Sequence, residues 1–442
     1  MARALNVLAG DRQVGQLREQ DDIWEFEYTA QWQASPEVFD LSPALSRRSL
    51  LHRDGSSQRP VQWYFDNLLP EEGLRTLLSN EAGIPEADAF GLLAHFGRES
   101  AGSLTLLRQG ESEAGDHGRN ELSQATLSQR IDRLPKAPIN RDAPKRMSLA
   151  GAQHKLLVIY EDGALFEPVG GTPSTHLLKP NHPDAGYPAS VLNEYFTMRL
   201  ADRMRLRVPA VHRLRVPQPV YLIDRFDRVP DDGGRLFKRL HTVDACQLLN
   251  KSRAFKYTEA SVETLNELIE RCRSKASARQ EIFRWLAFNV LIGNGDNHLK
   301  NLSFLVHPDG VELAPAYDLL STAVYDTRAI ADTEAKWPAT HLALPLPGAA
   351  TFGAVRRSHL VDAGRALNLP PRAIDRELDR MSAGLLAAAD QLIAEIESET
   401  EAEVAQCPNP SAASEFVPNE MRLLSCIRGI VIQDMLRQVA TA

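Results

Sequence analysis

The stretch Gly293–Leu305 reads GNGDNHLKNLSFL and places a carboxylate, Asp296, five residues before an amide, Asn301. It directly follows Ser277–Gly293, SARQEIFRWLAFNVLIG, whose apolar residues recur at helical spacing. Apolar side chains also fill the other face of that predicted helix, so we expect it to be buried nearly all round. A buried helix would hold the polar stretch that follows it in a fixed place.

The separation of Asp296 and Asn301 reproduces the D-x-x-x-x-N spacing of kinase catalytic loops. A carboxylate at the end of a rigid helix can accept the proton of an attacking hydroxyl, while a nearby amide oxygen holds magnesium. Asp318, in LAPAYDLLS, lies 318 − 296 = 22 residues further on and would give another oxygen ligand. The spacing alone also fits a polar turn that caps a buried helix.

Two more polar residues, His298 and Lys300, lie in the same loop. A lone histidine is more often a structural hydrogen-bonding residue than a ligand, and we favour that role for His298. Lys300 would either neutralise transferred phosphate or lie in solvent, and the sequence does not separate these two possibilities.

Upstream, Met147–Val158 (MSLAGAQHKLLV) is a turn of small residues before a strand, where Gly151 would let backbone amides approach phosphate oxygens. An ordinary turn is the commoner explanation of a single glycine. STHLLKP places Lys179 on a strand, from which a kinase lysine reaches nucleotide phosphates, although strand lysines usually face water at an edge. Glu194 on the next helix would pair with Lys179 or lie on the surface. Asp224–Phe226 could form a hinge whose backbone meets adenine.

The composition excludes several classes of protein. The chain has 442 residues, and 50 Lys and Arg against 58 Asp and Glu give a net charge of −8, which argues against a protein that coats nucleic acid by itself. Its four cysteines lie at no C-x-x-C spacing, so a zinc knuckle has no support. The most apolar run, Trp285–Gly293, is too short to span a membrane, and the first residues lack a secretory apolar region. We expect a cytoplasmic protein without membrane contact.

The order of patterns along the chain is strand-rich, then mixed, then helix-rich. Trp24, Phe26 and Tyr28 alternate with glutamates, Gly10-Asp11 predicts a turn, and residues 61–84 predict two helices with Pro70 in the first turn of the second. We predict an α+β, bilobal, protein-kinase-like fold with a β-rich N-terminal subdomain and small lobe and an all-helical large C-terminal lobe. The predicted segments are residues 1–107 (N-terminal subdomain), 108–238 (small lobe), 239–395 (large lobe) and 396–442 (a helical tail).

Seven motifs, in order, resemble the HipA family of bacterial serine/threonine kinase toxins: FDNLLPE, SLAGAQHK, THLLKP, NEYFTMRLA, IDRFDR, GNGDNHLKN and AYDLLS. The resemblance covers residues 5 to 395 and implies that Asp296 is catalytic, supported by Lys179, with Asn301 and Asp318 holding Mg²⁺. It implies an ATP site made of Ala150, Gly151, Ala152, Gln153, His154, Lys155, Lys179, Asp224, Arg225, Phe226 and Asp318. Ser148 matches the family's inhibitory autophosphorylation serine. His154 departs from the family pattern, where an acidic residue is expected, and the tail after residue 396 has no counterpart.

The resemblance also implies a reaction and partners. The γ-phosphate of ATP would pass to a serine of a translation protein, glutamyl-tRNA synthetase in the best-known branch of the family. A small HipB-like helix-turn-helix antitoxin would neutralise the toxin and bring it to operator DNA, and an acidic chain suits a basic DNA-binding partner. Two alternatives stay open: a small-molecule phosphotransferase of the aminoglycoside or phosphoinositide kinase type, and a non-catalytic corepressor.

Overall fold

The chain folds as two units, each built from segments that are distant in sequence. The first unit comprises residues 1–178, 224–255 and 303–314, and the second comprises residues 179–223, 256–302 and 315–442. The computed structural model describes residues 2–112, 117–146, 150–151, 153–231, 237–331 and 334–440. The division of the chain into the four consecutive segments 1–107, 108–238, 239–395 and 396–442 stays a prediction.

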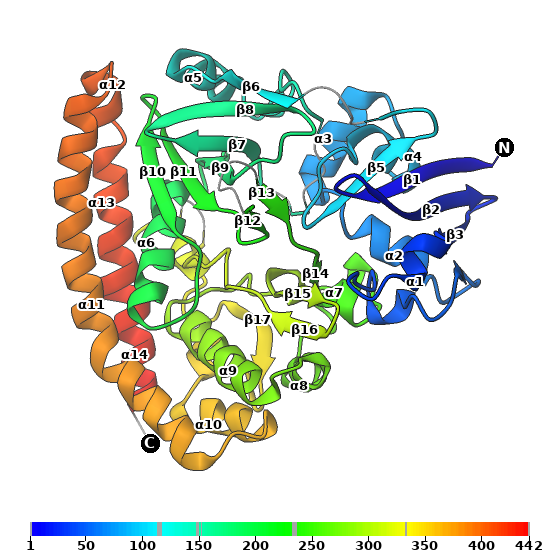
Figure 1. Cartoon of the computed structure of the whole chain (residues 1–442). Coiled ribbons are helices and arrows are strands. Elements are labelled where there is room, and N and C mark those ends of the chain that lie inside the picture. Colours follow the sequence, from blue (N-terminus) through cyan, green and yellow to red (C-terminus); the bar gives the residue numbers. More distant parts are fainter. Residues whose placement is uncertain are drawn as a thin grey trace. The chain divides into compact units, whose positions relative to one another are not determined.

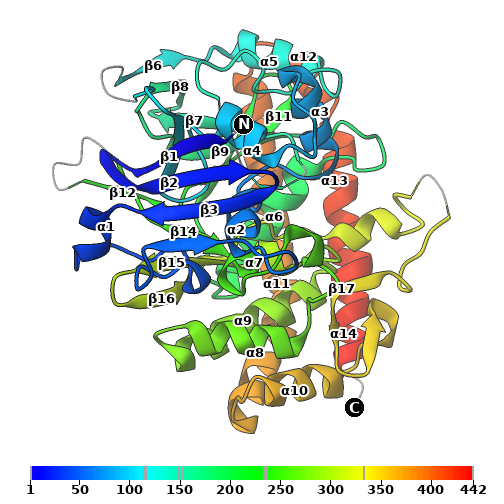
Figure 2. The same ribbon diagram turned by 90° about the vertical axis from the view of Figure 1, so that its right-hand side faces the viewer.

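The first unit begins with a five-stranded antiparallel sheet in the order β4-β3-β2-β1-β5. Its strands are β1 (Arg3–Ala9), β2 (Arg12–Gln20), β3 (Ile23–Tyr28), β4 (Leu51–Arg53) and β5 (Leu104–Arg108). Strands β1, β2 and β3 lie side by side in Figure 2. Trp24, Phe26 and Tyr28 are buried as their alternation predicts, and the predicted turn joins β1 to β2.

Short helices complete this part of the unit. They are α1 (Ala30–Ala34), η1 (Pro43–Leu45), α2 (Pro60–Asp66), α3 (Glu72–Ala82), α4 (Ala89–Phe96), α5 (Gln124–Asp132), α7 (Ala245–Leu248) and η2 (Arg253–Phe255). The two helices predicted within residues 61–84 are α2 and α3. The second starts later than predicted, because Glu71 is the extended N-cap and Pro70 therefore precedes the helix.

Three further sets of strands belong to the first unit. Strands β6-β8-β7-β9 are neighbours in that order within a six-stranded sheet, a hairpin pairs β12 with β13, and a small sheet has the order β14-β15-β16. The bounds are β6 (His117–Glu121), β7 (Leu156–Glu161), β8 (Ala164–Gly170), β9 (His176–Pro180), β12 (Arg228–Pro230), β13 (Phe237–Arg239), β14 (Thr242–Asp244), β15 (Ser303–His307) and β16 (Gly310–Leu313). Strand β9 crosses from the first unit into the second after Leu178.

The second unit is mostly helical. It contains α6 (Ser190–Arg203), β10 (Val211–Arg215), β11 (Pro219–Asp224), α8 (Val262–Arg271), α9 (Lys275–Leu291), η3 (Leu299–Asn301), η4 (Thr322–Asp326), β17 (His341–Leu346), β18 (Ala349–Thr351), η5 (Phe352–Ala354) and α10 (Arg357–Ala366). Helix α9 is the predicted buried helix. The mixed α+β class is confirmed, but the prediction of an all-helical segment 239–395 is wrong, because β14 to β18 fall within it. These strands have three to six residues, too few to show a clear period in the sequence.

The C-terminal residues form helices that pack within the second unit. They are α11 (Pro371–Gln406), α12 (Pro410–Ser414), α13 (Val417–Cys426), the π-helical η6 (Ile427–Ile432) and α14 (Gln433–Ala440). Helix α11 lies beside α13 and α14 (Figure 1), and it runs through the predicted boundary at residue 395. Arg215 of β10 binds Glu420 of α13, where each side chain is 1% exposed. Among the described helices, none is long and apolar enough to cross a lipid bilayer.

Candidate active site

Three of the predicted site residues, Lys179, Glu194 and Asp318, are in contact within the second unit. The Nζ of Lys179 lies 2.8 and 3.0 Å from the two carboxylate oxygens of Glu194 and also donates to Oδ1 of Asp318. The side chain is buried and does not face water at an edge. Burial lowers the pKa of Lys179, but the charges of Asp318 and Glu194 outweigh it and raise that pKa above its ordinary value. The lysine is therefore a fixed cation, and the pairing with Glu194 that the sequence left open is present.

Helix α6 also fixes the segment that follows Asp318. Asn193, next to Glu194, donates from Nδ2 to the carbonyl of Ser321 at 2.9 Å, and the Ser321 amide donates to Asn193 Oδ1 at 2.8 Å. Both residues are fully buried. Asp318 itself has a φ of 55°, which non-glycine residues rarely adopt and which persists only where the surroundings impose it. The two-way amide bond is part of those surroundings.

The catalytic-loop motif begins where α9 ends. Gly293 has a φ of 69°, and a Cβ there would lie 2.5 Å from Val431 Cγ1, so the turn requires glycine. Asn294 then joins three parts of the site: its Oδ1 accepts from the Asp296 amide at 3.0 Å, and its Nδ2 donates to Asn289 Oδ1 at 2.7 Å and to the Asp318 carbonyl at 3.5 Å. The buried helix does hold the loop in a fixed place, as the sequence predicts.

The predicted base, Asp296, and the predicted metal ligand, Asn301, are joined directly. Asn301 Nδ2 donates to the backbone carbonyl of Asp296 at 2.8 Å, which leaves the amide oxygen of Asn301 as the group able to bind a cation. Asp296 Oδ1 accepts a 2.5 Å hydrogen bond from the hydroxyl of Tyr257. Burial raises the pKa of Asp296 and nearby Asp318 adds to this, whereas His298, the Tyr257 bond and Lys256 act in the opposite direction.

His298 and Lys300 are both buried in the loop. The His298 ring lies edge-on to Tyr257, with centroids 4.9 Å apart, whereas its structural hydrogen-bonding role stays a prediction. Lys300 is 6% exposed, so the possibility that it is a solvated lysine is wrong. Its backbone carbonyl accepts from Tyr317 Oη at 2.8 Å, which ties the loop to the residue before Asp318.

The predicted phosphate loop lies in the first unit, and Ser148 and Ala152 lie outside the described residues. Gly151 has a φ of 105°, and a Cβ there would come within 2.8 Å of Lys155 Nζ, so the position favours glycine. Lys155 Nζ donates to the carbonyl of Ala150 at 2.5 Å. Gln153 and His154 are half-buried within the same turn.

The predicted hinge, Asp224–Phe226, begins with the last residue of β11 and also lies in the first unit. Asp224 forms a 3.0 Å contact with His176 Nε2, and the Arg225 amide donates to the carbonyl of Thr175 at 2.9 Å. The Arg225 guanidinium points instead into a buried ion cluster, where it binds both carboxylate oxygens of Asp227. Phe226 is half-buried and lies in the turn between β11 and β12.

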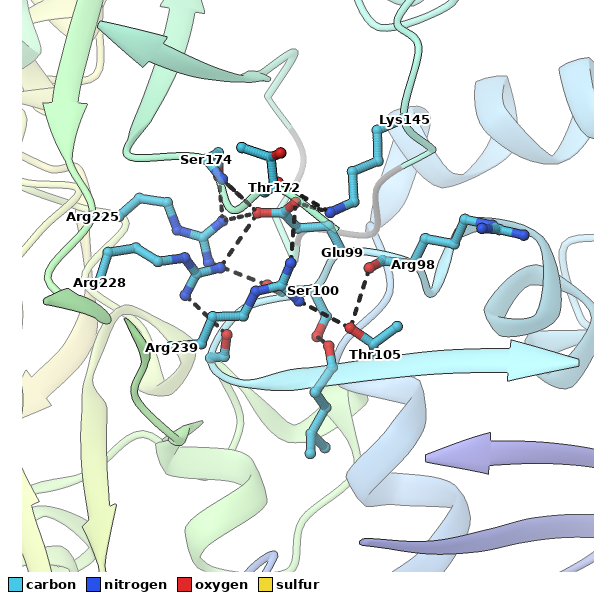
Figure 3. A network of polar contacts seen from close by, with 12 residues as sticks. Arg98, Glu99, Ser100, Thr105, Lys145, Thr172, Ser174, Arg225, Arg228 and Arg239 are labelled. Carbon is cyan, nitrogen blue, oxygen red and sulfur yellow. Dashed lines mark hydrogen bonds and ion pairs between the residues drawn. The ribbon is translucent and has the colours of Figure 1, made fainter. Parts of the chain in front are cut away.

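Glu99 is the centre of that cluster (Figure 3), and no pattern in the sequence indicated it. It is fully buried and forms ion pairs with Lys145 at 2.7 Å, Arg225 at 3.3 Å and Arg228 at 3.4 Å. Burial would raise the pKa of Glu99, but these cations and Arg239 outweigh it and hold that pKa well below its usual range. The carboxylate therefore joins the residues after α4 to the hinge and to the segment leading to the phosphate loop.

The donor set fits magnesium. Asn301 offers an amide oxygen and Asp318 a carboxylate, the hard oxygen ligands that Mg²⁺ prefers, and few of them. Magnesium keeps its other positions for water and phosphate, so two protein ligands would be enough to hold it.

Both halves of the chain match known families. The HipA N-terminal domain matches residues 5–107, and the HipA-like C-terminal domain matches residues 147–389. The chain is 36% identical over 337 residues to Y4mE of Sinorhizobium fredii, covering 73% of this chain and 78% of that protein. It is 31% identical over 340 residues to the serine/threonine-protein kinase toxin HipA of Shewanella oneidensis, covering 73% and 76%.

A solved structure extends the likeness to the whole fold. The chain resembles HipA in the Shewanella oneidensis complex of HipA, HipB and operator DNA, with a TM-score of 0.74 and 26% identity over 97% of this chain and 99% of that one. The kinase-like fold class is thereby confirmed. Since the C-terminal domain match spans more than half of the residues and the N-terminal match precedes it, this chain belongs to the HipA family of serine/threonine kinase toxins.

Proposed function

We propose that this chain is an ATP-dependent protein kinase that transfers the γ-phosphate of ATP to a serine of a protein. The observation that carries the proposal is the contact of Lys179 with both Glu194 and Asp318. In protein kinases, a strand lysine paired with a helix glutamate and a metal-binding aspartate must be in place for phosphoryl transfer. Asp296 and Asn301 of the same unit supply the remaining parts.

Each residue would have its own task. Lys179 would bind nucleotide phosphates, and Asp296 would accept the proton of the attacking hydroxyl. Magnesium held by Asn301 and Asp318 would neutralise charge on the phosphate oxygens. Because little covalent chemistry is asked of the protein in phosphoryl transfer, positioning and charge neutralisation would supply most of the catalysis.

The proposed nucleotide site also includes the hinge and the phosphate loop. Residues 150–155 would cradle phosphates, and Asp224, Arg225 and Phe226 would meet adenine through their backbone. The left-handed turn at Gly151 supports the first assignment, because closely spaced backbone amides bind phosphate oxygens. The Arg225 guanidinium is committed to Asp227 and Glu99 and would not itself contact the nucleotide.

The proposed partners are a HipB-like helix-turn-helix antitoxin and, through it, operator DNA. The Shewanella HipA that this chain resembles was solved with HipB and its operator. A net charge of −8 supports contact with a basic DNA-binding dimer rather than direct coating of DNA. The proposed substrate is a translation protein, with a glutamyl-tRNA synthetase as the first to test.

Ser148 is the proposed autophosphorylation site. A phosphate there would add about −1.5 to −2 charges to a loop meant to bind phosphate. Repulsion from ATP, or capture by Lys145 and Arg146, would then hold the loop away from the nucleotide. If this is right, Ser148→Ala stays active after preincubation with Mg·ATP, whereas the wild type loses activity. An equal loss in both proteins would remove this part of the proposal.

The kinase proposal is tested by incubating the purified chain with Mg·ATP and a cell lysate and mapping phosphate by mass spectrometry. Asp296→Ala is treated in parallel. We expect new phosphoserine only with the wild type. Phosphate on a small alcohol but on no protein would favour the small-molecule phosphotransferase, and antitoxin binding without any phosphate transfer would favour the corepressor.

A further inference from the structure

Tyr257 contacts the proposed base, although it lies 39 residues before it in the chain. Its hydroxyl donates to Asp296 Oδ1 at 2.5 Å, at the short end of the range for a hydroxyl bound to an ionised carboxylate. The segment that carries it is tied to the loop by backbone, since the Leu299 amide donates to the Lys256 carbonyl at 3.1 Å. All of these residues belong to the second unit.

The tyrosine ring is held from two directions but is not enclosed. Its edge contact with His298 has an interplanar angle of 81°, and Lys256 Nζ lies 5.1 Å from the ring centroid. The residue is nevertheless 42% exposed, so its ring is only partly packed. The bond to Asp296 adds a directional contact to the ring contacts.

The bond has a direct chemical consequence for the carboxylate. Asp296 has two oxygens, so Oδ2 can accept a proton from a substrate hydroxyl while Oδ1 accepts from Tyr257. A hydrogen bond to one oxygen also removes the freedom of the carboxylate to rotate about its terminal bond. General-base catalysis depends on that orientation, because the base must lie within hydrogen-bond reach of the proton it takes.

We infer that Tyr257 is a positioning residue for the proposed phosphoryl transfer: its hydroxyl fixes the Asp296 carboxylate and leaves Oδ2 to act as the base. This inference rests on the proposed function, because it assigns Tyr257 a task in that reaction. The groups that act electrostatically on Asp296 are Tyr257, His298, Lys256 and Asp318. Of these groups, Tyr257 can be deprived of its hydrogen bond to Asp296 by removing a single oxygen atom.

Tyr257→Phe is the test, because the ring and its contacts remain. Tyr187→Phe is the matched control: that tyrosine belongs to the same unit, is 45% exposed, and packs its ring 5.2 Å from Tyr325. The first readout is independent of activity. In full-length protein labelled with ¹³C at the aspartate carboxyls, the resonance lost in Asp296→Asn identifies Asp296, and its chemical shift at one fixed pH reports the hydrogen bond to that carboxylate.

Removing the Tyr257 donor should move the ¹³C carboxyl resonance of Asp296 in Tyr257→Phe and leave it unchanged in Tyr187→Phe. In phosphate transfer to the proteins identified from lysate, kcat should fall about tenfold, part of what a general base contributes, with the KM for ATP unchanged. An unchanged Asp296 resonance in Tyr257→Phe would overturn the inference, even if the wild type is an active kinase. An inactive wild type, with an Asp296 resonance that does move in Tyr257→Phe, would instead count against the proposed function and would reduce the role of Tyr257 to holding that carboxylate.

Discussion

Lys179 Nζ lies 2.8 Å from Glu194 Oε1, and both side chains are almost completely buried. A buried cation and a buried carboxylate depend on one another, because removing either leaves the other charge without its partner in a poorly solvated place. The same lysine contacts Asp318, so the position of Glu194 on α6 bears on the proposed metal ligand as well as on the lysine.

Glu194→Gln should therefore lower the rate of phosphate transfer. This loss should be larger than its effect on the free energy of unfolding. The amide keeps the shape of the side chain but not its charge, so Lys179 would be held by Asp318 alone. We expect kcat/KM to fall by at least tenfold, measured by steady-state kinetics with ATP as the varied substrate. Glu401→Gln, an exposed position on α11, is the control and should behave as wild type. Equal activity of the two variants would show that the ion pair has no part in catalysis.

The pH dependence of the reaction should reflect the environment of Asp296. Burial raises the pKa of this carboxyl, and a general base must be ionised to accept a proton. Activity is therefore expected to be lost on the acid side at a higher pH than an ordinary aspartate, with its pKa of about 3.9, would give. The measurement is log kcat/KM against pH. Residual activity of Asp296→Asn should lack this acid limb, and a limb that persists there belongs to another group.

Glu99 should be one of the most sensitive positions for stability. Glu99→Gln leaves Lys145, Arg225 and Arg228 without their shared carboxylate, and breaking a buried ion pair costs about 3–5 kcal/mol. Because the pKa of Glu99 is lower in the folded state, its contribution is present above the unfolded pKa of about 4.3 and is lost as pH falls through the folded pKa.

Urea unfolding of the wild type and Glu99→Gln between about pH 5 and pH 8 should therefore give a constant difference in unfolding free energy. Glu111→Gln is the control, since its 3.1 Å pair with Arg98 is exposed and contributes about 0–1 kcal/mol. A difference between Glu99→Gln and wild type no larger than that of the control would contradict the buried-cluster account.

The C-terminal helices should depend on Glu420. Its carboxylate is buried with Arg215, which also contacts Glu403 at 3.3 Å. Glu420→Gln should weaken the docking of α13, seen as faster hydrogen exchange in residues 417–440 and a loss of about 3–5 kcal/mol. Glu415→Gln, at an exposed position, should leave exchange unchanged. Unaltered exchange in Glu420→Gln would mean that apolar packing alone holds these helices.

The sequence was most informative for site residues that lie close together along the chain. Asp296 and Asn301 lie five residues apart on one loop, and α9 before them has an apolar pattern that predicts its burial. Lys179 contacts residues up to 139 positions away in the chain. No local spacing could predict these contacts, and only the order of the motifs along the chain indicated them.

Other parts of the site left no pattern in the sequence. Tyr257 precedes a helix in a short irregular segment, and its partner lies beyond two intervening helices. Glu99 binds residues 46 to 140 positions away, and a single buried carboxylate has no period to detect. The strands β14 to β18 were missed because each is short and gains its stability from pairing with another short strand.

The central claim is that Asp296 is the base of a protein-kinase reaction. The most direct measurement is the transfer of radiolabelled γ-phosphate from ATP to lysate proteins by the wild type and by Asp296→Asn, after circular dichroism and thermal unfolding show that both are equally folded. The account predicts labelled phosphoserine with the wild type and a loss of at least a hundredfold in rate with the variant. Equal labelling by two equally folded proteins, or none by either, would contradict it.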